Sequence, residues 1–186
     1  DLLTRGIDDN GELRPPPEEA PHLYKDSPLG LIPRPWETSP LSTRFEVKGG
    51  KRLPFGHQYS ETPTGYRYLR VLDFFDKPIY FTALENLCQK TFWALQRYEI
   101  VEPDIYISIA GSIGYAGVFR PPSMTLDRTI LTENAARMKA KSDANPEFVV
   151  FQMNHDRVQR QIEVEKGTGG GVPKLALFRI ESLLLA

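Results

Sequence analysis

The chain has 186 residues, of which 40% are hydrophobic and 11% aromatic; this is enough for one sizeable core, and the length suits one domain with an extension better than two. It contains no run of about 18 apolar residues and no charged-then-apolar amino terminus, which argues against a membrane span or a signal peptide. The single cysteine, Cys88, cannot form an internal disulfide, so we expect a reducing, cytoplasmic setting.

The net charge of −1 argues at first against a nucleic-acid partner, but the charges are unevenly distributed. Residues 1–30 hold seven acids and three bases, whereas residues 41–70 hold six bases and two acids. Without the acidic first 30 residues the chain has a net charge of +3. The sequence therefore predicts a modest basic face that is formed by a minority of its residues.

The first part of the chain is rich in proline. Residues 8–40 contain eight prolines, which predicts an extended, mostly irregular linker, and we expect Trp36 to pin this linker to the core. Residues 41–47 form a short helix or strand that ends at Gly49 and Gly50. Residues 48–59 lack a regular apolar period and are expected to be an exposed basic loop.

The middle of the chain alternates between strand and helix patterns. Residues 66–72 read as a buried strand that stops near Asp73, and residues 86–100 read as a helix. In that helix we expect Phe92 and Trp93 to belong to the core rather than to stack on bases.

Two β-rich runs between residues 104 and 119 flank Gly111-Ser112-Ile113-Gly114. Glycines allow positive φ and leave backbone N–H groups free to approach an anion such as a phosphate. An ordinary β-turn followed by a glycine bulge at Gly117 is the alternative reading.

The last third predicts a β segment at 129–132, a charged loop at 137–143 and a helix from Asn145 to about Val164. Asn145 is the expected N-cap, with Pro146 in the first turn. The apolar side chains expected to face the core from this helix are Phe148, Phe151, Val158 and Ile162. The predicted class is α+β, with short helices packed on a twisted mixed β-sheet formed by the segments that begin at Tyr66, Asp104, Tyr115 and Thr129.

Several fragments resemble parts of enzyme sites. Residues 145–148, Asn-Pro-Glu-Phe, resemble the base-holding motif of amino-methyltransferases, but the second proline and a glycine-rich cofactor loop are missing. Residues 46–48, Glu-Val-Lys, resemble the end of a nuclease site without its upstream acidic partner. The three histidines lack metal-ligand spacing, and Gly167–Gly171 lacks the lysine of a Walker loop. The sequence therefore predicts no catalytic residues, no metal and no cofactor.

Five blocks occur in an order and spacing that resemble the specificity subunit of type I restriction-modification systems. These blocks are residues 2–7, 25–37, 68–74, 104–119 and 167–175. The resemblance implies that the first block closes a long conserved helix, that the second opens a target recognition domain, and that the third and fourth are strands within that domain. It assigns residues 1–26 to the end of the conserved helical region and the proline-rich linker, and residues 27–186 to the recognition domain.

A full subunit of that family carries two recognition domains, spaced by two long antiparallel helices. The chain is accordingly interpreted as a fragment that holds one domain, the second, C-terminal one; a natural half-subunit that dimerises is the alternative. The resemblance implies a non-catalytic protein that reads one half of a bipartite target in double-stranded DNA. Its further partners would be the methyltransferase (M) and restriction (R) subunits, with no membrane.

Reading DNA requires side chains that clamp phosphates and forked or amide side chains that pair with base edges. The candidates are Lys48, Lys51, Arg52, His57, Gln58 and Tyr59 in the basic loop, Arg67 and Arg70 beside a strand, Ser112 in the glycine turn, Arg120 after it, and Lys166 and Lys174 around the glycine-rich loop.

Three other readings stay open. The domain could serve a fused restriction-methyltransferase enzyme. A protein-interaction module fits the near-neutral charge and predicts no salt-dependent affinity for DNA. A nuclease or methyltransferase domain predicts a clustered carboxylate or cofactor site, which the sequence does not contain.

Overall fold

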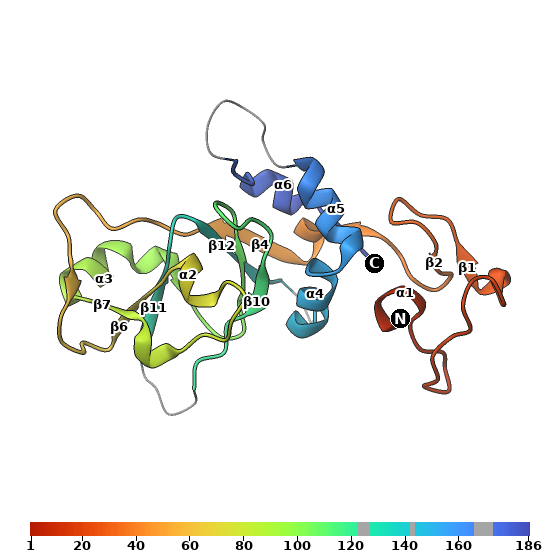
Figure 1. Ribbon diagram of the computed structural model, residues 1–186, viewed down its shortest axis with the longest axis horizontal. Coiled ribbons are helices and arrows are strands. Elements are labelled where there is room, and N and C mark those ends of the chain that lie inside the picture. Colours follow the sequence, from red (N-terminus) through yellow and green to blue (C-terminus); the bar gives the residue numbers. More distant parts are fainter. Residues whose placement is uncertain (123–126, 142–143, 166–172) are drawn as a thin grey trace.

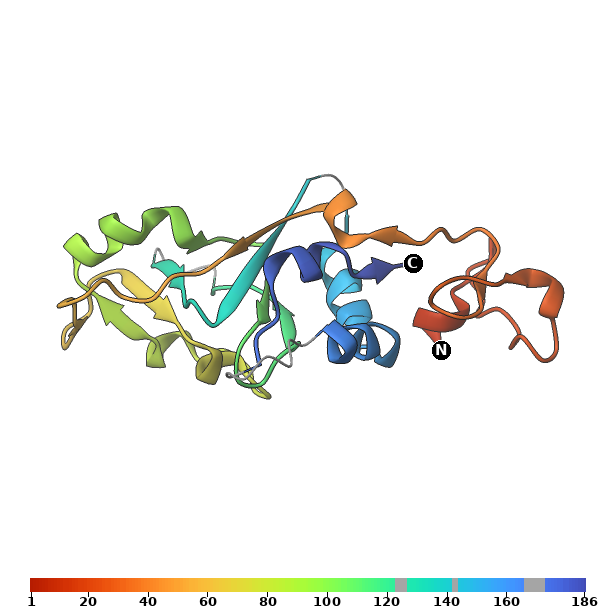
Figure 2. The same cartoon turned by 90° about the horizontal axis from the view of Figure 1, so that it is seen from above.

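The computed structural model describes residues 1–122, 127–141, 144–165 and 173–186. The molecule is elongated (Figure 1). The five-stranded sheet lies at one end of the long axis, the four-stranded sheet in the centre, and the N-terminal residues at the other end. A second view, from above, shows the same arrangement (Figure 2). The α+β class with short helices is confirmed, and among the described residues no helix is long and apolar enough to cross a membrane.

A four-stranded antiparallel sheet occupies the centre of the molecule. Its strand order is β10 (Ala116–Val118), β9 (Ile105–Ser108), β12 (Ala135–Ala140), β4 (Phe45–Gly49). All four residues of β9 are buried, whereas β4 alternates between buried and exposed side chains. One core cluster joins this sheet to helices α4 (Pro146–Met153) and α5 (Asp156–Glu165).

A five-stranded mixed sheet occupies one end. Its order is β5 (Tyr59–Ser60), β7 (Glu85–Leu87), β6 (Tyr66–Leu69), β11 (Arg128–Leu131), β8 (Glu99–Ile100), with only the pairing of β6 and β11 parallel among the described strands. Helix α3 (Gln89–Leu95) buries Phe92 and Leu95 against this sheet. A third core cluster joins the two sheets, because Tyr106 and Phe119 of the central part pack with Leu69 and Leu131.

The remaining elements are short. They are α1 (Leu2–Arg5), α2 (Val71–Phe74), α6 (Leu177–Glu181), strands β1 (Tyr24–Lys25), β2 (Ile32–Pro33), β3 (Ser39–Pro40) and β13 (Leu184–Leu185), and 3-10 helices at Pro21–Leu23, Leu41–Thr43, Phe81–Ala83 and Gln96–Tyr98. The expected element at residues 41–47 is therefore a 3-10 helix followed directly by a strand.

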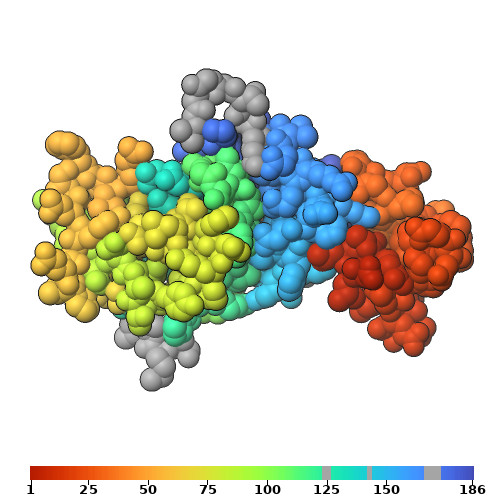
Figure 3. Space-filling model, viewed as in Figure 1, coloured from red at the N-terminus to blue at the C-terminus, as the bar shows by residue number. Residues whose placement is uncertain are grey.

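The N-terminal residues form a lobe at one end of the molecule (Figure 3). As expected, this segment is mostly irregular, although β1 and β2 pair as a short hairpin whose loop is formed by residues 26–31. Trp36 is half-buried and packs on Gly6, where a Cβ atom would lie 2.6 Å from the ring. Trp36 thus connects the two ends of this segment to each other. We had expected it to pack into the core, but it belongs to none of the buried core clusters.

Both chain ends lie between this lobe and the central sheet (Figures 1 and 2). Leu3 and Ala186 line the same small cavity. The Arg157 guanidinium donates a hydrogen bond of 2.9 Å to the carbonyl of Leu31 and so connects α5 to the lobe.

Several expected elements differ from the structure in the middle of the chain. The four segments expected in one sheet are divided between two, because β6 and β11 lie in one sheet and β9 and β10 in the other. The strand from Tyr66 ends at Leu69, where Asp73 caps α2 and turns the chain. The helix expected at 86–100 is interrupted, since strands β7 and β8 flank α3 and its 3-10 extension. Phe92 is buried as expected, whereas Trp93 is 45% exposed.

Two further expectations fail toward the C-terminus. The charged loop expected at 137–143 is strand β12 up to Ala140, since Arg137 forms an ion pair with buried Asp104 and can lie inside the sheet. Asn145 is the N-cap, as expected, but the helix breaks after Met153. Val158 and Ile162 are buried, whereas Phe148 and Phe151 are 39% and 66% exposed.

Candidate nucleic-acid interface

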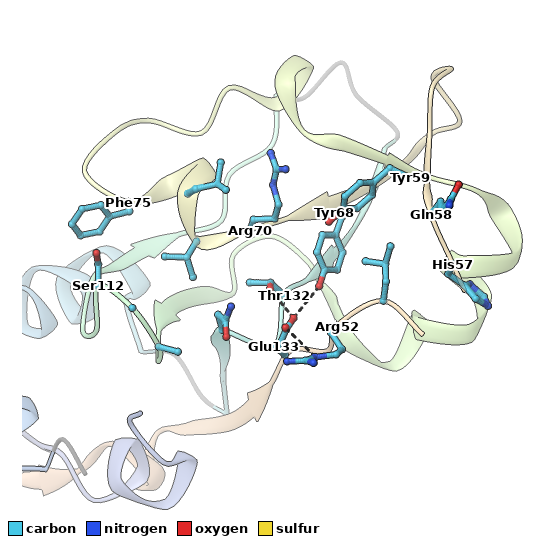
Figure 4. Close-up of a pocket in the computed structure, with 16 residues that line it drawn as sticks. Arg52, His57, Gln58, Tyr59, Tyr68, Arg70, Phe75, Ser112, Thr132 and Glu133 are labelled. Carbon is cyan, nitrogen blue, oxygen red and sulfur yellow. Dashed lines mark hydrogen bonds and ion pairs between the residues drawn. The ribbon is translucent and has the colours of Figure 1, made fainter. Parts of the chain in front are cut away.

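An open groove of about 1090 Å³ lies where the two sheets meet. Its walls come from the basic loop, from β6 and α2, from the glycine turn after β9, and from the turn between β11 and β12 (Figure 4). The lining residues are Arg52, Leu53, His57, Gln58, Tyr59, Tyr68, Arg70, Val71, Leu72, Phe75, Ala110, Gly111, Ser112, Thr132, Glu133 and Asn134. The groove thus brings together six of the predicted DNA-binding residues from segments far apart in the sequence.

The basic loop is anchored at its start and along its length. Gly50 passes so close to the turn after β11 that a Cβ atom would lie 2.1 Å from the carbonyl oxygen of Thr132. The next residue, Lys51, donates its N–H to Leu131 and accepts a hydrogen bond of 2.8 Å from the Tyr68 hydroxyl. His57 is held by a contact of 2.8 Å between its Nδ1 and the hydroxyl of Thr91 on α3. The loop is therefore exposed to solvent, but hydrogen bonds to Leu131, Tyr68 and Thr91 fix its position.

The floor of the groove carries a small polar network (Figure 4). One carboxylate oxygen of Glu133 accepts a hydrogen bond of 3.0 Å from the hydroxyl of Thr132. The same oxygen lies 3.3 Å from the Tyr68 hydroxyl, whose single hydrogen is shared between Glu133 and the carbonyl of Lys51. The other carboxylate oxygen lies 3.2 Å from Nε of Arg52. Burial raises the pKa of Tyr68 well above its usual value, so the phenol stays protonated and remains a hydrogen-bond donor.

The glycine turn has the positive φ angles that its sequence predicts, +75° at Gly111 and +92° at Gly114. Ser108 holds the turn closed, since its hydroxyl accepts from the N–H of Tyr115 at 3.0 Å and donates to the carbonyl of Ser112. Gly114 donates its N–H to the carbonyl of Ser108. The turn therefore presents Gly111 and Ser112, rather than Gly114, to the groove.

Gly117 is no bulge, because it lies in regular register opposite Tyr106. A Cβ atom there would lie 2.3 Å from the Tyr106 hydroxyl, so glycine is needed for the close packing of this ring.

Arg70 lines the groove but is held by acidic neighbours. Its guanidinium forms two hydrogen bonds to Asp73, at 2.9 and 3.0 Å, and one of 2.6 Å to Glu85. The hydrogen bond to Asp73 is the main cause that raises the pKa of Arg70. These contacts fix the start of α2. Arg70 therefore stabilises the structure of the groove wall and also contributes a positive charge to it.

Four other candidates lie outside the groove lining. Arg67 is engaged with Asp127 at 2.6 Å and Asn86 at 2.7 Å, as a structural residue of the five-stranded sheet. Lys48 pairs with Glu46 at 2.9 Å on β4. Arg120 bridges Glu102 and Glu147, and the exposed Lys51 lies at the base of the basic loop.

Of the two lysines around the glycine-rich loop, Lys174 forms a backbone bridge with Ala110 and so lies beside the glycine turn. Lys166 lies outside the described residues.

The sequence reading missed the groove floor. Tyr68 was assigned to a buried strand, and the Thr132-Glu133-Asn134 turn was not considered. The polar turn between two strands could have indicated these residues from the sequence. Its position beside Tyr68, however, depends on the pairing of β6 with β11. No three His, Cys, Asp or Glu side chains are grouped as metal ligands in the parts of the chain that the structure describes.

No family model and no curated protein sequence matches this chain. Solved structures do match. An HsdS subunit from Thermoanaerobacter tengcongensis has a TM-score of 0.57 and 11% identity over 88% of this chain and 36% of its own. The S subunit of a type I restriction-modification system from M. genitalium has a TM-score of 0.51 and 11% identity over 81% of this chain and 33% of its own.

A third structure, described as showing complex assembly and conformational transition of the type I R-M system, has a TM-score of 0.56 and 12% identity over 83% of this chain and 34% of its own. The chain therefore spans about a third of the length of the structures it matches. At these identities the comparison concerns the fold, and the likeness to type I specificity subunits predicted from the sequence is confirmed at that level.

Proposed function

We propose that the chain is a target recognition domain of a type I restriction-modification specificity subunit and that it reads one half of a bipartite target in double-stranded DNA. The observation that carries the proposal is the groove between the sheets, which gathers Arg52, His57, Gln58, Tyr59, Arg70 and Ser112. The fold likeness to S subunits supports the same reading.

The chemistry of the groove suits base recognition. Guanidinium, amide and hydroxyl groups match the donors and acceptors that base pairs present in the major groove. Lys51, which precedes the groove residue Arg52, and Lys174, which is bridged to the groove residue Ala110, are suited to phosphate contacts. Such contacts position a protein on the duplex without reading its sequence.

The wider role follows from the resemblance. Residues 1–26 would belong to the end of the conserved helical region and linker, and residues 27–186 to the recognition domain, the second of a full subunit. The domain would be non-catalytic, use no cofactor and act in the cytoplasm, while M and R subunits modify and cut the DNA.

The test is selection of a randomised duplex library by the purified chain at about 50 and 200 mM salt, followed by sequencing of the retained DNA. We expect a short motif of about three to five base pairs, with affinity that falls as salt rises. The variant Arg52→Ala/Gln58→Ala should lose the motif. The matched control Gln96→Ala/Arg97→Ala, at exposed positions outside the groove, should keep it.

The selection is repeated with the methyltransferase subunit added. A motif that appears only then would identify DNA reading that needs the partner. An unenriched library in both cases would contradict the proposal and favour a protein-interaction module.

A further inference from the structure

Glu133 is unexpected in a groove that we propose for a polyanion, because a carboxylate repels phosphates. Its position is nevertheless well defined. The two hydroxyls that hold one of its oxygens belong to Tyr68 and Thr132, which are only 3% and 4% exposed. The Glu133 side chain itself is 25% exposed. A rigid, partly exposed carboxylate therefore points from the groove floor.

The contact between Glu133 and Arg52 adds little to the stability of the fold. The Arg52 side chain is 76% exposed, and the contact is a single one of 3.2 Å through Nε. Exposed ion pairs of this kind are screened by water and salt. Tyr68 and Thr132 already contact the carboxylate, and Arg52 is the exposed partner of the pair. The contact places the guanidinium group of Arg52 directly beside the carboxylate of Glu133, which is a hydrogen-bond acceptor.

That combination is complementary to one base pair. On the major-groove edge of a G·C pair, guanine presents the acceptors N7 and O6, and cytosine presents the N4 amino donor next to them. An arginine fork pairs with the guanine acceptors, and a carboxylate accepts from the cytosine amino group. The Arg52 contact to Glu133 uses Nε, and the terminal nitrogens of the guanidinium are the donors that guanine requires.

We propose that Glu133 and Arg52 together read one G·C base pair, with Glu133 accepting from cytosine N4 and Arg52 donating to guanine O6 and N7. This inference rests on the proposed function and names the specificity-determining residues of that site. Tyr68 and Thr132 are positioning residues that aim the carboxylate.

The test is the same library selection with three variants, Glu133→Gln, Arg52→Ala and the control Glu12→Gln, which changes an exposed carboxylate in the N-terminal lobe. The wild-type motif should contain one G·C position whose preference falls roughly five- to a hundred-fold in both groove variants. Glu133→Gln should gain adenine there, because an amide can pair with adenine N6 and N7. Every other position of the motif should be unchanged, and the control should match the wild type.

The outcomes separate this inference from the proposed function. A wild-type motif that both groove variants retain, or that they alter at different positions, would overturn the inference and leave the DNA-reading role intact. No wild-type motif at all, with or without the methyltransferase subunit, would overturn both. Arg52 is exposed, so Arg52→Ala keeps the test decisive even if Glu133→Gln unfolds, which circular dichroism would report.

Discussion

The side chain of Asn154 bridges the backbone of Ala116 on strand β10. Its Nδ2 donates to the Ala116 carbonyl at 2.9 Å, and its Oδ1 accepts from the Ala116 N–H at 3.2 Å. β10 is an edge strand of the central sheet, so these backbone groups face away from β9 and need a partner from elsewhere. The break between α4 and α5 is where the chain supplies that partner.

Replacement of Asn154 by alanine should therefore destabilise the fold. The variant leaves two backbone groups of Ala116, a buried residue, without their partner, and we expect a loss of about 1–3 kcal/mol in the free energy of unfolding. Urea unfolding measures it. Asn10→Ala, at an exposed turn in the N-terminal lobe, is the control and should change the free energy little. Equal stability of the two variants would contradict the bridging role.

Alanine variants of Gly50 and Gly49 form a matched pair that tests how the basic loop is anchored. Gly50→Ala places a methyl group 2.1 Å from a backbone oxygen, so the loop must shift, and we expect a cost of about 1–3 kcal/mol together with weaker DNA binding. Gly49→Ala meets only the side chain of Leu177 at 3.5 Å, an ordinary contact. Thermal unfolding and binding measurements on both variants test this. The idea fails if Gly49→Ala is the more damaging change.

Tyr106 should make the fold sensitive to alkaline pH. Burial raises the pKa of its hydroxyl to about 12, above the ordinary value of 10.0. The phenol ionises first in the unfolded chain, so its contribution is fully present below pH 10 and is lost as the pH rises toward 12. The loss is on the order of 2 kcal/mol. Unfolding free energies between pH 9 and pH 12 measure it. Tyr106→Phe should make the fall in stability shallower, while Tyr68, whose pKa burial also raises, keeps part of it. An unchanged profile in that variant would assign the alkaline sensitivity to other groups.

Lys51 tests the phosphate contacts separately from base reading. Lys51→Ala should weaken binding to all sequences alike and lower the slope of log affinity against log salt by about one, because one fewer counterion is released. The selected motif should stay the same. Lys77→Ala, at an exposed position outside the groove lining, is the control. A changed motif in Lys51→Ala would show that Lys51 contacts bases.

Features that depend on neighbouring residues were predictable from the sequence. The strands around the glycine turn, the positive φ of Gly111 and Gly114, and the Asn145 cap all follow from local backbone chemistry. The exposed basic loop was also predictable, and five of its residues line the groove.

The rest was decided by contacts between residues far apart in the chain. Tyr68 and Glu133 meet across 65 positions and Arg67 and Asp127 across 60, because β6 and β11 pair in parallel. Composition and periodicity determined that this is an α+β domain with a basic loop and a glycine turn. Only the tertiary structure divided the strands into two sheets, left Trp93 and Phe151 exposed, and placed a carboxylate on the groove floor. The reason is physical, since the burial of a side chain and the partner of a charge are properties of the packed chain rather than of its local pattern.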